Sequence, residues 1–384
     1  MKKNLEIKKL GEVCNFEGGS QPPKSNFIYE PKEGYVRFLQ IRDFASDKYI
    51  TYIPDSKKNR HCDVGDILLG RYGASVGKIL INKKGAYNVA VMKTIPNTEL
   101  IDKNYFYYYL ISDEFQRPLS KVASRSAQAG FSKDDIYNFP VLTPSHLEQK
   151  RIVEILDEAI EKIAKAKENA EKNLKNSKDL FESYLQSLFA KLGRDWEEKT
   201  LGDIGKPSMC KRILKHQTSP SGEIPFYKIG TFGKKPNAFI SKELYNEFRT
   251  KYSFPKKGDI LISASGTIGR RVRYDGEPAF FQDSNIVWID NDEKQVLNDY
   301  LFVFYEFCDW QPSKGATIAR LYNSNLTSIK IVFPKSLSEQ KALVNKIDIF
   351  SEQTKKLEAN YKQKIADLDE LKKSLLTKAF AGEL

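Results

Sequence analysis

The chain has 384 residues, of which 40% are hydrophobic and 29% charged, and its formal net charge is +12. This length leaves room for two or three domains, and the composition is typical of a globular protein rather than a disordered one. No apolar run approaches the roughly 20 residues of a membrane span, and the start MKKNLEIKKL has no signal-peptide core, so we expect a cytoplasmic protein without a membrane partner. The positive charge favours a polyanionic partner such as nucleic acid, although lysine can also serve solubility alone.

The cysteines and histidines predict no metal site. The four cysteines, Cys14, Cys62, Cys210 and Cys308, lie far apart and form no C-x-x-C pair. This spacing predicts neither a disulfide framework nor a zinc site. His61 beside Cys62 is the nearest approach to a ligand pair, but nothing nearby completes a set of ligands. We therefore expect no metal and no cofactor in this chain.

Residues 1–144 read as a first globular domain. Short β-branched and aromatic runs, YVRFLQI, DILLGRY, GKILIN and AVMKTI, alternate with turns rich in Gly, Pro, Asn and Asp, which indicates strands. One apolar helix is expected from Tyr105 to Phe115. Because no regular crossover helices separate the strands, the pattern favours an α+β domain with an antiparallel or mixed sheet.

Residues 145–192 predict one long helix. Pro144 precedes Ser145, and Glu148 follows three residues later, which is the spacing of a capping box. The helix contains neither Gly nor Pro, and apolar residues return at three- and four-residue steps, as in a coiled coil. At ~1.5 Å per residue it would be roughly 70 Å long. The residues that we expect to pair with another helix or to dock another subunit are Ile152, Leu156 and Ile163.

Residues 193–335 predict a second globular domain, and residues 336–384 a second long helix. The domain begins after Gly193 and contains the strand-like runs PFYKIG, DILISAS, RRVRY and NIVWI. Ser336 and Glu339 repeat the capping-box spacing before a second apolar stripe, whose register drifts near Tyr361. The expected pairing or docking residues are Leu343, Ile347, Leu357, Ile365 and Leu368. Two helices of a larger bundle are the alternative to a matched pair.

The second half of the chain repeats the first. KKLGEVCNF returns as KTLGDIGKP, VGDILLGRYGASVGKILI as KGDILISASGTIGRRVRY, and PSHLEQK as PKSLSEQK, in the same order. This is an internal duplication. We predict two similar α+β domains separated by a pair of long antiparallel helices and related by a pseudo-two-fold axis. Two readers held apart by a stiff spacer suit two half-sites on DNA, with helix length setting the separation.

A search for catalytic motifs finds none that holds. GASVGK at Gly73 has three residues between its glycines, not four, and Ile79 stands where a phosphate loop needs Ser or Thr. Asn138-Phe139-Pro140 only faintly resembles a methyltransferase tetrapeptide, and the first copy of the repeat lacks the glutamate of Glu197-x-Lys199. With three histidines in the chain, no Ser/His or Cys/His constellation forms. We predict that the chain is not an enzyme.

Polar and basic groups in turn-rich contexts are the candidates for DNA contact, since Arg and Gln can read base edges and basic residues bind phosphates. For any one of them, an ordinary solvated surface residue is the alternative. In the first half they are Arg71, Tyr72, Lys78, Arg125 and Gln128. In the second half they are Ser263, Ser265, Arg270, Arg271, Arg273, Lys314, Thr317 and Arg320.

Several motifs together resemble the specificity subunit of type I restriction–modification systems. Each half opens with L-G-[DE]-[IV], contains G-D-I-L and [VI]-G-[KR], and closes with Pro and E-Q-K before a long helix, and the chain ends in KSLLTKAFAGEL. The resemblance covers essentially the whole chain. It implies that the globular parts are target recognition domains, each reading one half of a bipartite asymmetric DNA site. Residue-level DNA contacts do not carry over, because these domains are the family's variable part.

The resemblance also implies partners. The helices would dock two DNA adenine methyltransferase subunits, which bring S-adenosylmethionine, and restriction subunits that use ATP and Mg²⁺ would join this core. The specificity subunit itself would be non-catalytic. Three alternatives remain: an enzyme in its own right, a coiled-coil scaffold with two protein-binding heads, and a modification system without restriction.

Overall fold

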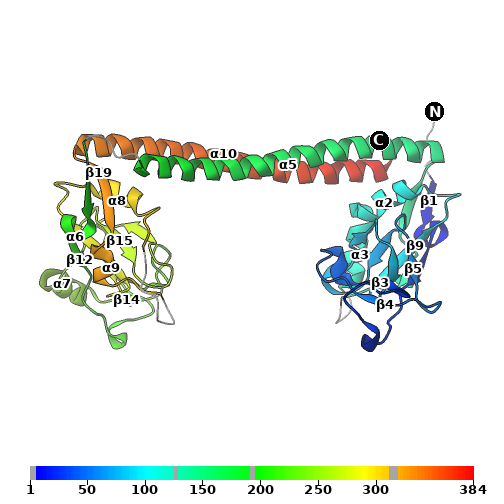
Figure 1. Cartoon of the computed structure of the whole chain (residues 1–384), viewed down its shortest axis with the longest axis horizontal. Coiled ribbons are helices and arrows are strands. Elements are labelled where there is room, and N and C mark those ends of the chain that lie inside the picture. Colours follow the sequence, from blue (N-terminus) through cyan, green and yellow to red (C-terminus); the bar gives the residue numbers. More distant parts are fainter. Residues whose placement is uncertain (1–5, 125–128, 191–194, 311–318) are drawn as a thin grey trace. The chain divides into compact units, whose positions relative to one another are not determined.

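The computed structural model describes residues 6–124, 129–190, 195–310 and 319–384. The chain divides into two compact units: unit 1 is Met1–Asn173 with Tyr361–Leu384, and unit 2 is Leu174–Asn360. Each unit contains one copy of the repeat and a part of both long helices (Figure 1). In the described part of the chain, no helix combines the length and the apolar character that a membrane span requires.

Among the described residues, the first copy is built from short strands and four α-helices. Its strands are β1 (Glu6–Lys9), β2 (Cys14–Gly18), β3 (Tyr35–Leu39), β4 (Tyr52–Pro54), β5 (His61–Cys62), β6 (Leu68–Gly70), β7 (Ile79–Leu80), β8 (Gly85–Tyr87), β9 (Val91–Pro96) and β10 (Pro140–Thr143). Its helices are α1 (Leu10–Val13), α2 (Lys103–Ile111), α3 (Asp113–Ala123) and α4 (Lys133–Ile136), and the long helix α5 (His146–Ala190) follows.

The second copy follows the same order with two differences in the described residues: a helix stands where the first copy has β5, and α3 has no counterpart. Its strands are β11 (Trp196–Thr200), β12 (Gly205–Ser208), β13 (Ile224–Tyr227), β14 (Phe239–Ile240), β15 (Ile260–Ser263), β16 (Arg271–Arg273), β17 (Phe280–Phe281), β18 (Ile286–Asn291) and β19 (Lys330–Pro334). Its helices are α6 (Leu201–Ile204), α7 (Lys242–Lys251), α8 (Asn298–Phe304) and α9 (Asn323–Thr327), and the long helix α10 (Leu337–Ala381) follows.

The sheets confirm the duplication. Each copy has a four-stranded antiparallel sheet, which we call its inner sheet. It is β2-β9-β6-β7 in the first copy and β12-β18-β15-β16 in the second. Each has an outer sheet with one parallel pair, β3 with β8 and β13 with β17. In each, the first strand pairs antiparallel with the last, as β1 with β10 and β11 with β19. The predicted α+β class with mixed sheets and an internal repeat is therefore confirmed.

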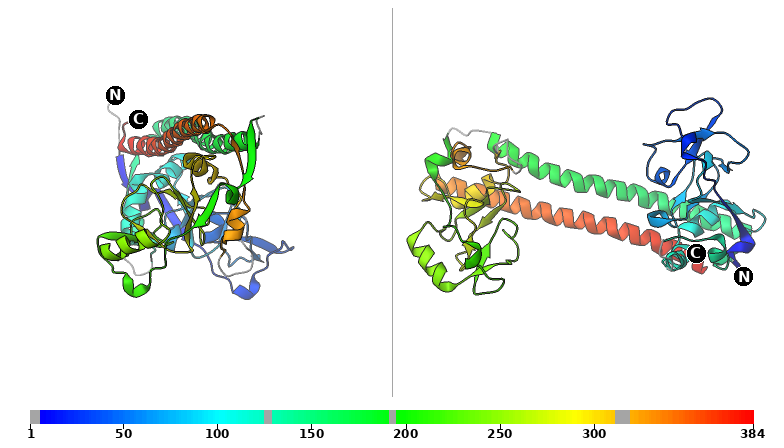
Figure 2. Two further views of the ribbon diagram at one scale, coloured as in Figure 1. Left: turned by 90° about the vertical axis from the view of Figure 1, so that its left-hand side faces the viewer. Right: turned by 90° about the horizontal axis from the view of Figure 1, so that it is seen from below.

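The two long helices pack against each other, as predicted, and lie side by side in Figures 1 and 2. In unit 1, Lys167 pairs with Asp369 at 2.6 Å, and Phe380 near the end of α10 contacts the ring of Tyr105 at 5.1 Å between centroids. In unit 2, Tyr184 packs on Phe350 at 4.7 Å. From Lys167 to Tyr184 the residue numbers of α5 rise, while those of their partners on α10 fall from Asp369 to Phe350. The two helices therefore run antiparallel.

Most predicted stripe residues lie in the helix seam or in the adjoining cores. Ile152 and Leu156 belong to the core of the first copy, and Ile347 to that of the second. The remaining buried or half-buried members are Ile163, Leu343, Ile365 and Leu368. Whether they also dock another subunit stays a prediction.

Leu357 is the exception, because its side chain is 43% exposed while Thr354 is 8% exposed. The buried and half-buried positions of α10 step by four and three residues from Thr354 to Tyr361 and on to Ile365. The seam therefore runs without the drift that the sequence suggested, and Leu357 lies beside it. Whether Leu357 contacts the other helix or docks another subunit stays a prediction.

The glutamine of the E-Q-K motif fastens each long helix to its domain. Gln149 is fully buried, donates to Pro144 O at 2.8 Å and Leu100 O at 3.0 Å, and accepts from Asp102 N at 2.6 Å. Asp102 in turn caps α2. A buried amide without partners is costly, and Gln149 has all of its contacts within the fold. The glutamine of the motif therefore has a structural role rather than a catalytic one.

Gln340 makes the matching contacts in the second copy. It is fully buried, donates to Pro334 O and Gln295 O at 2.8 Å each, and accepts from Leu297 N at 2.9 Å. The predicted caps are also present, since Ser145 and Ser336 each accept the backbone N–H three residues on at 3.4 Å.

The other shared motifs also support the scaffold. In G-D-I-L, Asp66 and Asp259 each accept the backbone N–H three residues earlier, at 3.0 and 2.7 Å, which closes the turn before β6 and β15. In L-G-[DE]-[IV], Leu10 and Leu201 are fully buried. The motifs common to both copies thus build the frame.

Candidate nucleic-acid interface

The β6–β7 connection is a tight hairpin loop. Gly70 donates to Lys78 O at 2.9 Å, and Gly77 donates to Gly70 O at 3.0 Å. Gly73 and Gly77 have φ of 59° and 77°, in the left-handed region that favours glycine. Since this segment joins two strands rather than a strand and a long helix, a phosphate loop is excluded here, as predicted.

The β15–β16 connection closes in the same way. Ser263 donates its N–H to Arg270 O at 2.8 Å, and Gly269 donates to Ser263 O at 3.0 Å. Gly266 and Gly269 have φ of 67° and 81°. The two hairpin loops are therefore structural equivalents in which Arg270 takes the place of Lys78.

A second segment of each copy packs on its hairpin loop. In the first copy, Tyr72 forms an antiparallel bridge with Gly130, and Gly73 donates to Ala129 O at 2.9 Å. In the second copy, Ser265 forms the same kind of bridge with Arg320. The fold thus brings together candidate groups that lie more than fifty residues apart in the sequence.

Arg71 and Tyr72 form one unit at the first loop. The guanidinium of Arg71 lies 5.1 Å from the centre of the Tyr72 ring and donates to Val89 O at 3.3 Å and Phe131 O at 3.4 Å. Tyr72 is 41% exposed, and Lys78 is also exposed. All three candidates are thus accessible from solvent, and an exposed ring beside a cation suits stacking and hydrogen bonding to nucleic acid.

Arg320 lies at the matching place in the second copy. Its Nη2 donates to Ser284 O at 3.2 Å and to Ser284 Oγ at 3.1 Å. Ser265 donates to Asn285 Oδ1 at 2.7 Å and is 9% exposed. The Ser265 hydroxyl therefore organises the turn, whereas half-buried Arg320 remains accessible.

Two of the second-half candidates, Ser263 and Arg271, make contacts within the domain. Ser263 is 1% exposed, and its Oγ accepts from Arg270 N at 2.9 Å. Arg271 pairs with Glu306 and lies 4.5 Å from the centre of the Phe302 ring. Burial lowers the pKa of Arg271. Ser263 is thus buried inside the domain, which leaves its side chain no access to DNA in this structure. Arg271 is half-buried, and whether it contacts DNA stays a prediction.

The remaining candidates divide into two groups. Arg270 donates to Phe232 O at 3.1 Å while staying half-buried, and Arg273 pairs with Asp299 on the surface. Arg125, Gln128, Lys314 and Thr317 lie outside the described residues.

The cysteines offer no reactive thiolate. Burial raises the pKa of Cys14, Cys210 and Cys308 to about 12 and that of Cys62 to about 11. These thiols stay protonated and non-nucleophilic at neutral pH. Among the described residues, no group of three or more His, Cys, Asp or Glu side chains could hold a metal ion.

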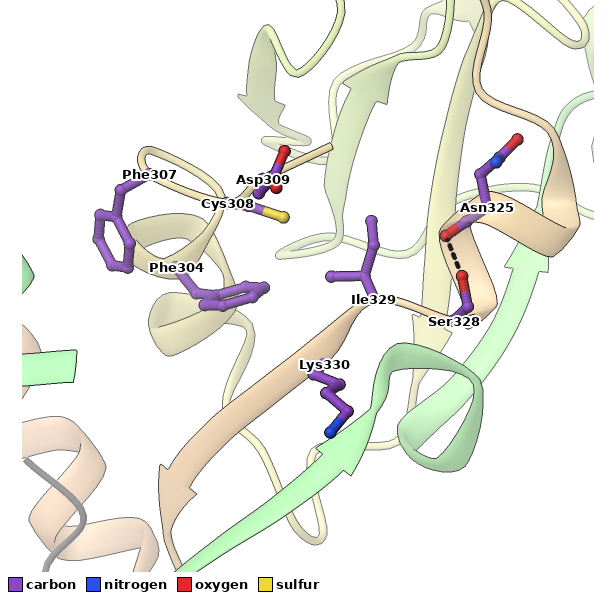
Figure 3. A pocket seen from close by; sticks show the side chains of 8 residues that line it. All are labelled: Phe304, Phe307, Cys308, Asp309, Asn325, Ser328, Ile329 and Lys330. Atoms are coloured by element: carbon purple, nitrogen blue, oxygen red, sulfur yellow. Dashed lines mark hydrogen bonds between the residues drawn. The ribbon is translucent and has the colours of Figure 1, made fainter. Parts of the chain in front are cut away.

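One pocket of about 420 Å³ opens in the second copy between α8 and β19 (Figure 3). The side chains of Phe304, Cys308 and Ile329 point toward one another there, and Lys330 stands at the edge. Half of its described lining is polar, namely Asp309, Asn325, Ser328 and Lys330. The Cys308 thiol there stays protonated, and the described lining contains no histidine that could activate it.

The comparisons with known proteins agree with this picture. The profile described as "Type I restriction modification DNA specificity domain" matches residues 2–175 and again residues 193–367. A Haemophilus influenzae protein described as a type I restriction enzyme specificity subunit is 39% identical over 355 residues, covering 90% of this chain and 87% of that protein. The chain belongs to the type I specificity family.

More distant members of the specificity family and solved structures match along the whole chain. The MjaIX specificity subunit of Methanocaldococcus jannaschii is 24% identical over 100% of this chain and 94% of that protein. The HsdS subunit of Thermoanaerobacter tengcongensis has the same fold, with a TM-score of 0.65 at 19% identity over 100% of this chain and 98% of that one. A chain from a study of complex assembly and conformational transition in the type I R-M system has a TM-score of 0.79 at 19% identity, over 100% and 99%.

Sequence reasoning on this specificity-family chain missed the role of its motif glutamines. Gln149 and Gln340 occupy matched positions in the two copies. A polar residue between Glu and Lys would nevertheless be predicted from sequence to be exposed. Their recurrence at matched positions in the duplication was the signal that could have identified them.

Proposed function

We propose that this chain is the DNA-recognition subunit of a type I restriction–modification complex, in which each globular domain reads one half of a bipartite, asymmetric DNA site. The observation that supports this is the pairing of one repeated frame with two different hairpin loops. Tyr72 and Gly130 in the first copy stand where Ser265 and Arg320 stand in the second. Two domains with one frame and different contact residues would read different half-sites.

The helices would set the spacer between the half-sites and dock two DNA adenine methyltransferase subunits. Exposed apolar residues on them, such as Leu147 at 82% and Leu371 at 48%, are suited to covering by a partner. S-adenosylmethionine would enter with the methyltransferases, and ATP and Mg²⁺ with restriction subunits. The chain itself would be non-catalytic and would act in the cytoplasm.

Sequencing of adenine methylation tests the recognition role. DNA from cells that express this chain with its methyltransferase should carry a split, asymmetric methylated motif, which disappears when the chain is omitted. Methylation that persists unchanged without the chain would exclude the role. The scaffold with two protein-binding heads, in which the net charge of +12 is incidental, would then be favoured, and it predicts no salt-dependent DNA binding.

Shortening both helices tests the spacer. Removing seven residues from α5 and the facing seven from α10 takes out about two turns, or ~10 Å, which corresponds to roughly three base pairs. The methylated motif should keep both half-sites and lose about that number of spacer positions. An unchanged spacer would show that the helices do not act as the ruler.

A further inference from the structure

The two copies hold a guanidinium at one equivalent place but supply it from opposite sides of the same backbone bridge. In the first copy, Arg71 precedes the bridge residue Tyr72, and its Nη1 donates to Val89 O at 3.3 Å. In the second copy, Arg320 is itself the opposite bridge residue, and its Nη2 donates to Ser284 O at 3.2 Å. Neither arginine has an arginine at its matched sequence position.

The backbone shows that the two acceptor carbonyls match. Arg71 donates its N–H to Ala90 O at 2.9 Å, and Ala264 donates its N–H to Asn285 O at 2.8 Å. Val89 and Ser284 each come one residue before these acceptors. The two guanidinium groups thus reach the same carbonyl of the turn that leads into β9 and β18.

Sterics explain why the arginine changes sides. A Cβ added to Gly130 would lie 2.7 Å from the Tyr72 ring, so a side chain opposite this tyrosine would force the ring to move. The first copy therefore supplies its guanidinium from Arg71, beside the ring. In the second copy, the small Ser265 stands opposite Arg320, and Ala264 replaces Arg71. The exchange is one coupled substitution at three positions.

We propose that this guanidinium site, formed by Arg71 in the first copy and Arg320 in the second, is the equivalent DNA-contact point of the two domains. The inference rests on the proposed function and adds which residues correspond. A guanidinium has five N–H donors. Among the described residues, Arg71 donates through Nε and Nη1 and Arg320 through Nη2. The donors that remain suit a phosphate oxygen or the O6 and N7 of guanine.

The first test uses Arg71→Gln and Arg320→Gln in the purified complex with the methyltransferase. Glutamine keeps an amide donor for the turn carbonyl but loses the charge. Each variant should weaken DNA binding roughly tenfold, since one good guanidinium contact contributes ~1–3 kcal/mol. Arg117→Gln on α3, where Arg117 pairs with Asp113, is the matched control and should bind like the wild type.

The two sources of acceptor separate in the same assay. A phosphate contact lowers the salt slope of binding by about 0.9 without changing the methylated motif, and a base contact relaxes one position of one half-site. Either result supports the contact. Binding within twofold of the wild type, with unchanged slope and motif, overturns it. If the wild-type complex itself binds no specific DNA, the proposed function fails first.

The second test moves the arginine across the bridge. Arg71→Ala with Tyr72→Ser should lose the contact, and adding Gly130→Arg should restore binding to within about threefold of the wild type, by analogy with one charged contact. The reverse exchange, Ala264→Arg, Ser265→Tyr and Arg320→Gly, should keep binding in the second domain. Each triple variant is compared with the same variant without its new arginine. If a folded triple variant in either domain, with its thermal unfolding midpoint retained, binds no better than that partner, the equivalence is overturned.

Discussion

The two copies share an inner frame and differ in how their outer sheets are stabilised. In the first copy, Arg37 pairs with Asp43 at 3.1 Å and with Asp47, and Asp47 also pairs with Lys83 at 2.8 Å. Its apolar clusters there are small. In the second copy, α7 and the outer sheet enclose one aromatic-rich core that includes Phe280.

The difference teaches which contacts a duplicated frame requires. The matched glutamines, leucines and aspartates of the motifs make the same contacts in both copies. The outer sheet has only to fold onto this frame, so ion pairs in one copy and aromatic packing in the other both suffice. The hairpin loops, which we propose to contact DNA, join strands of the shared sheets but carry different residues in the two copies.

Phe280→Ala should have the largest effect and should be confined to the second copy. Phe280 is 1% exposed, and its ring centre lies 6.1 Å from that of Phe248 and 5.9 Å from that of Phe254. Truncation should therefore cost about 3–5 kcal/mol of folding free energy. Urea unfolding with hydrogen exchange read at β13 and β17 measures it. Tyr29→Ala, at a side chain that is 71% exposed, is the control. A loss below about 1 kcal/mol would contradict the aromatic core.

Gln149→Leu and Gln340→Leu should destabilise the two copies equally. Each change leaves one buried N–H and two carbonyls without their partner, at a cost of about 2 kcal/mol. Urea unfolding of each variant gives the comparison, with Lys150→Leu at an exposed position as the control. Clearly unequal losses would show that the frames are not equivalent.

Asp47→Asn should remove a pH-dependent contribution that is specific to the first copy. Hydrogen bonds from Lys83 and Arg37 lower the pKa of Asp47 from 3.8 to about 2. The unfolded carboxylate therefore takes up a proton first, so the stabilisation is complete above about pH 4 and is lost between pH 4 and 2. The difference in thermal midpoint between wild type and variant should shrink across this window. A constant difference would contradict the assignment.

Glu198→Ile should have the smallest effect. Glu198 pairs with Lys330 at 2.7 Å on the β11–β19 ribbon, where the first copy has Ile7, which is 69% exposed. Exposed ion pairs contribute little. We expect no resolvable change in the thermal midpoint, and a clear shift would mean that this outer face matters to the frame.

Burial decides which of the candidate DNA-contact side chains are exposed to solvent. Polar and basic residues in a Gly-rich turn look alike in sequence whether they face solvent or the domain. Ser263 proved to be buried and Arg271 half-buried, while Tyr72 and Lys78 are exposed. The choice depends on partners such as Glu306, which is distant in sequence from Arg271.

The sequence by itself determined the duplication, the α+β class and the two long helices, because local propensity, capping residues and periodicity act over a few turns of chain. It also excluded a phosphate loop, because that motif depends on fixed spacing. Only the tertiary structure decided that the seam passes Thr354 rather than Leu357, that Gln149 is buried, and that Arg71 corresponds to Arg320. Each of these depends on which surfaces meet, and distant segments meet only once the chain has folded.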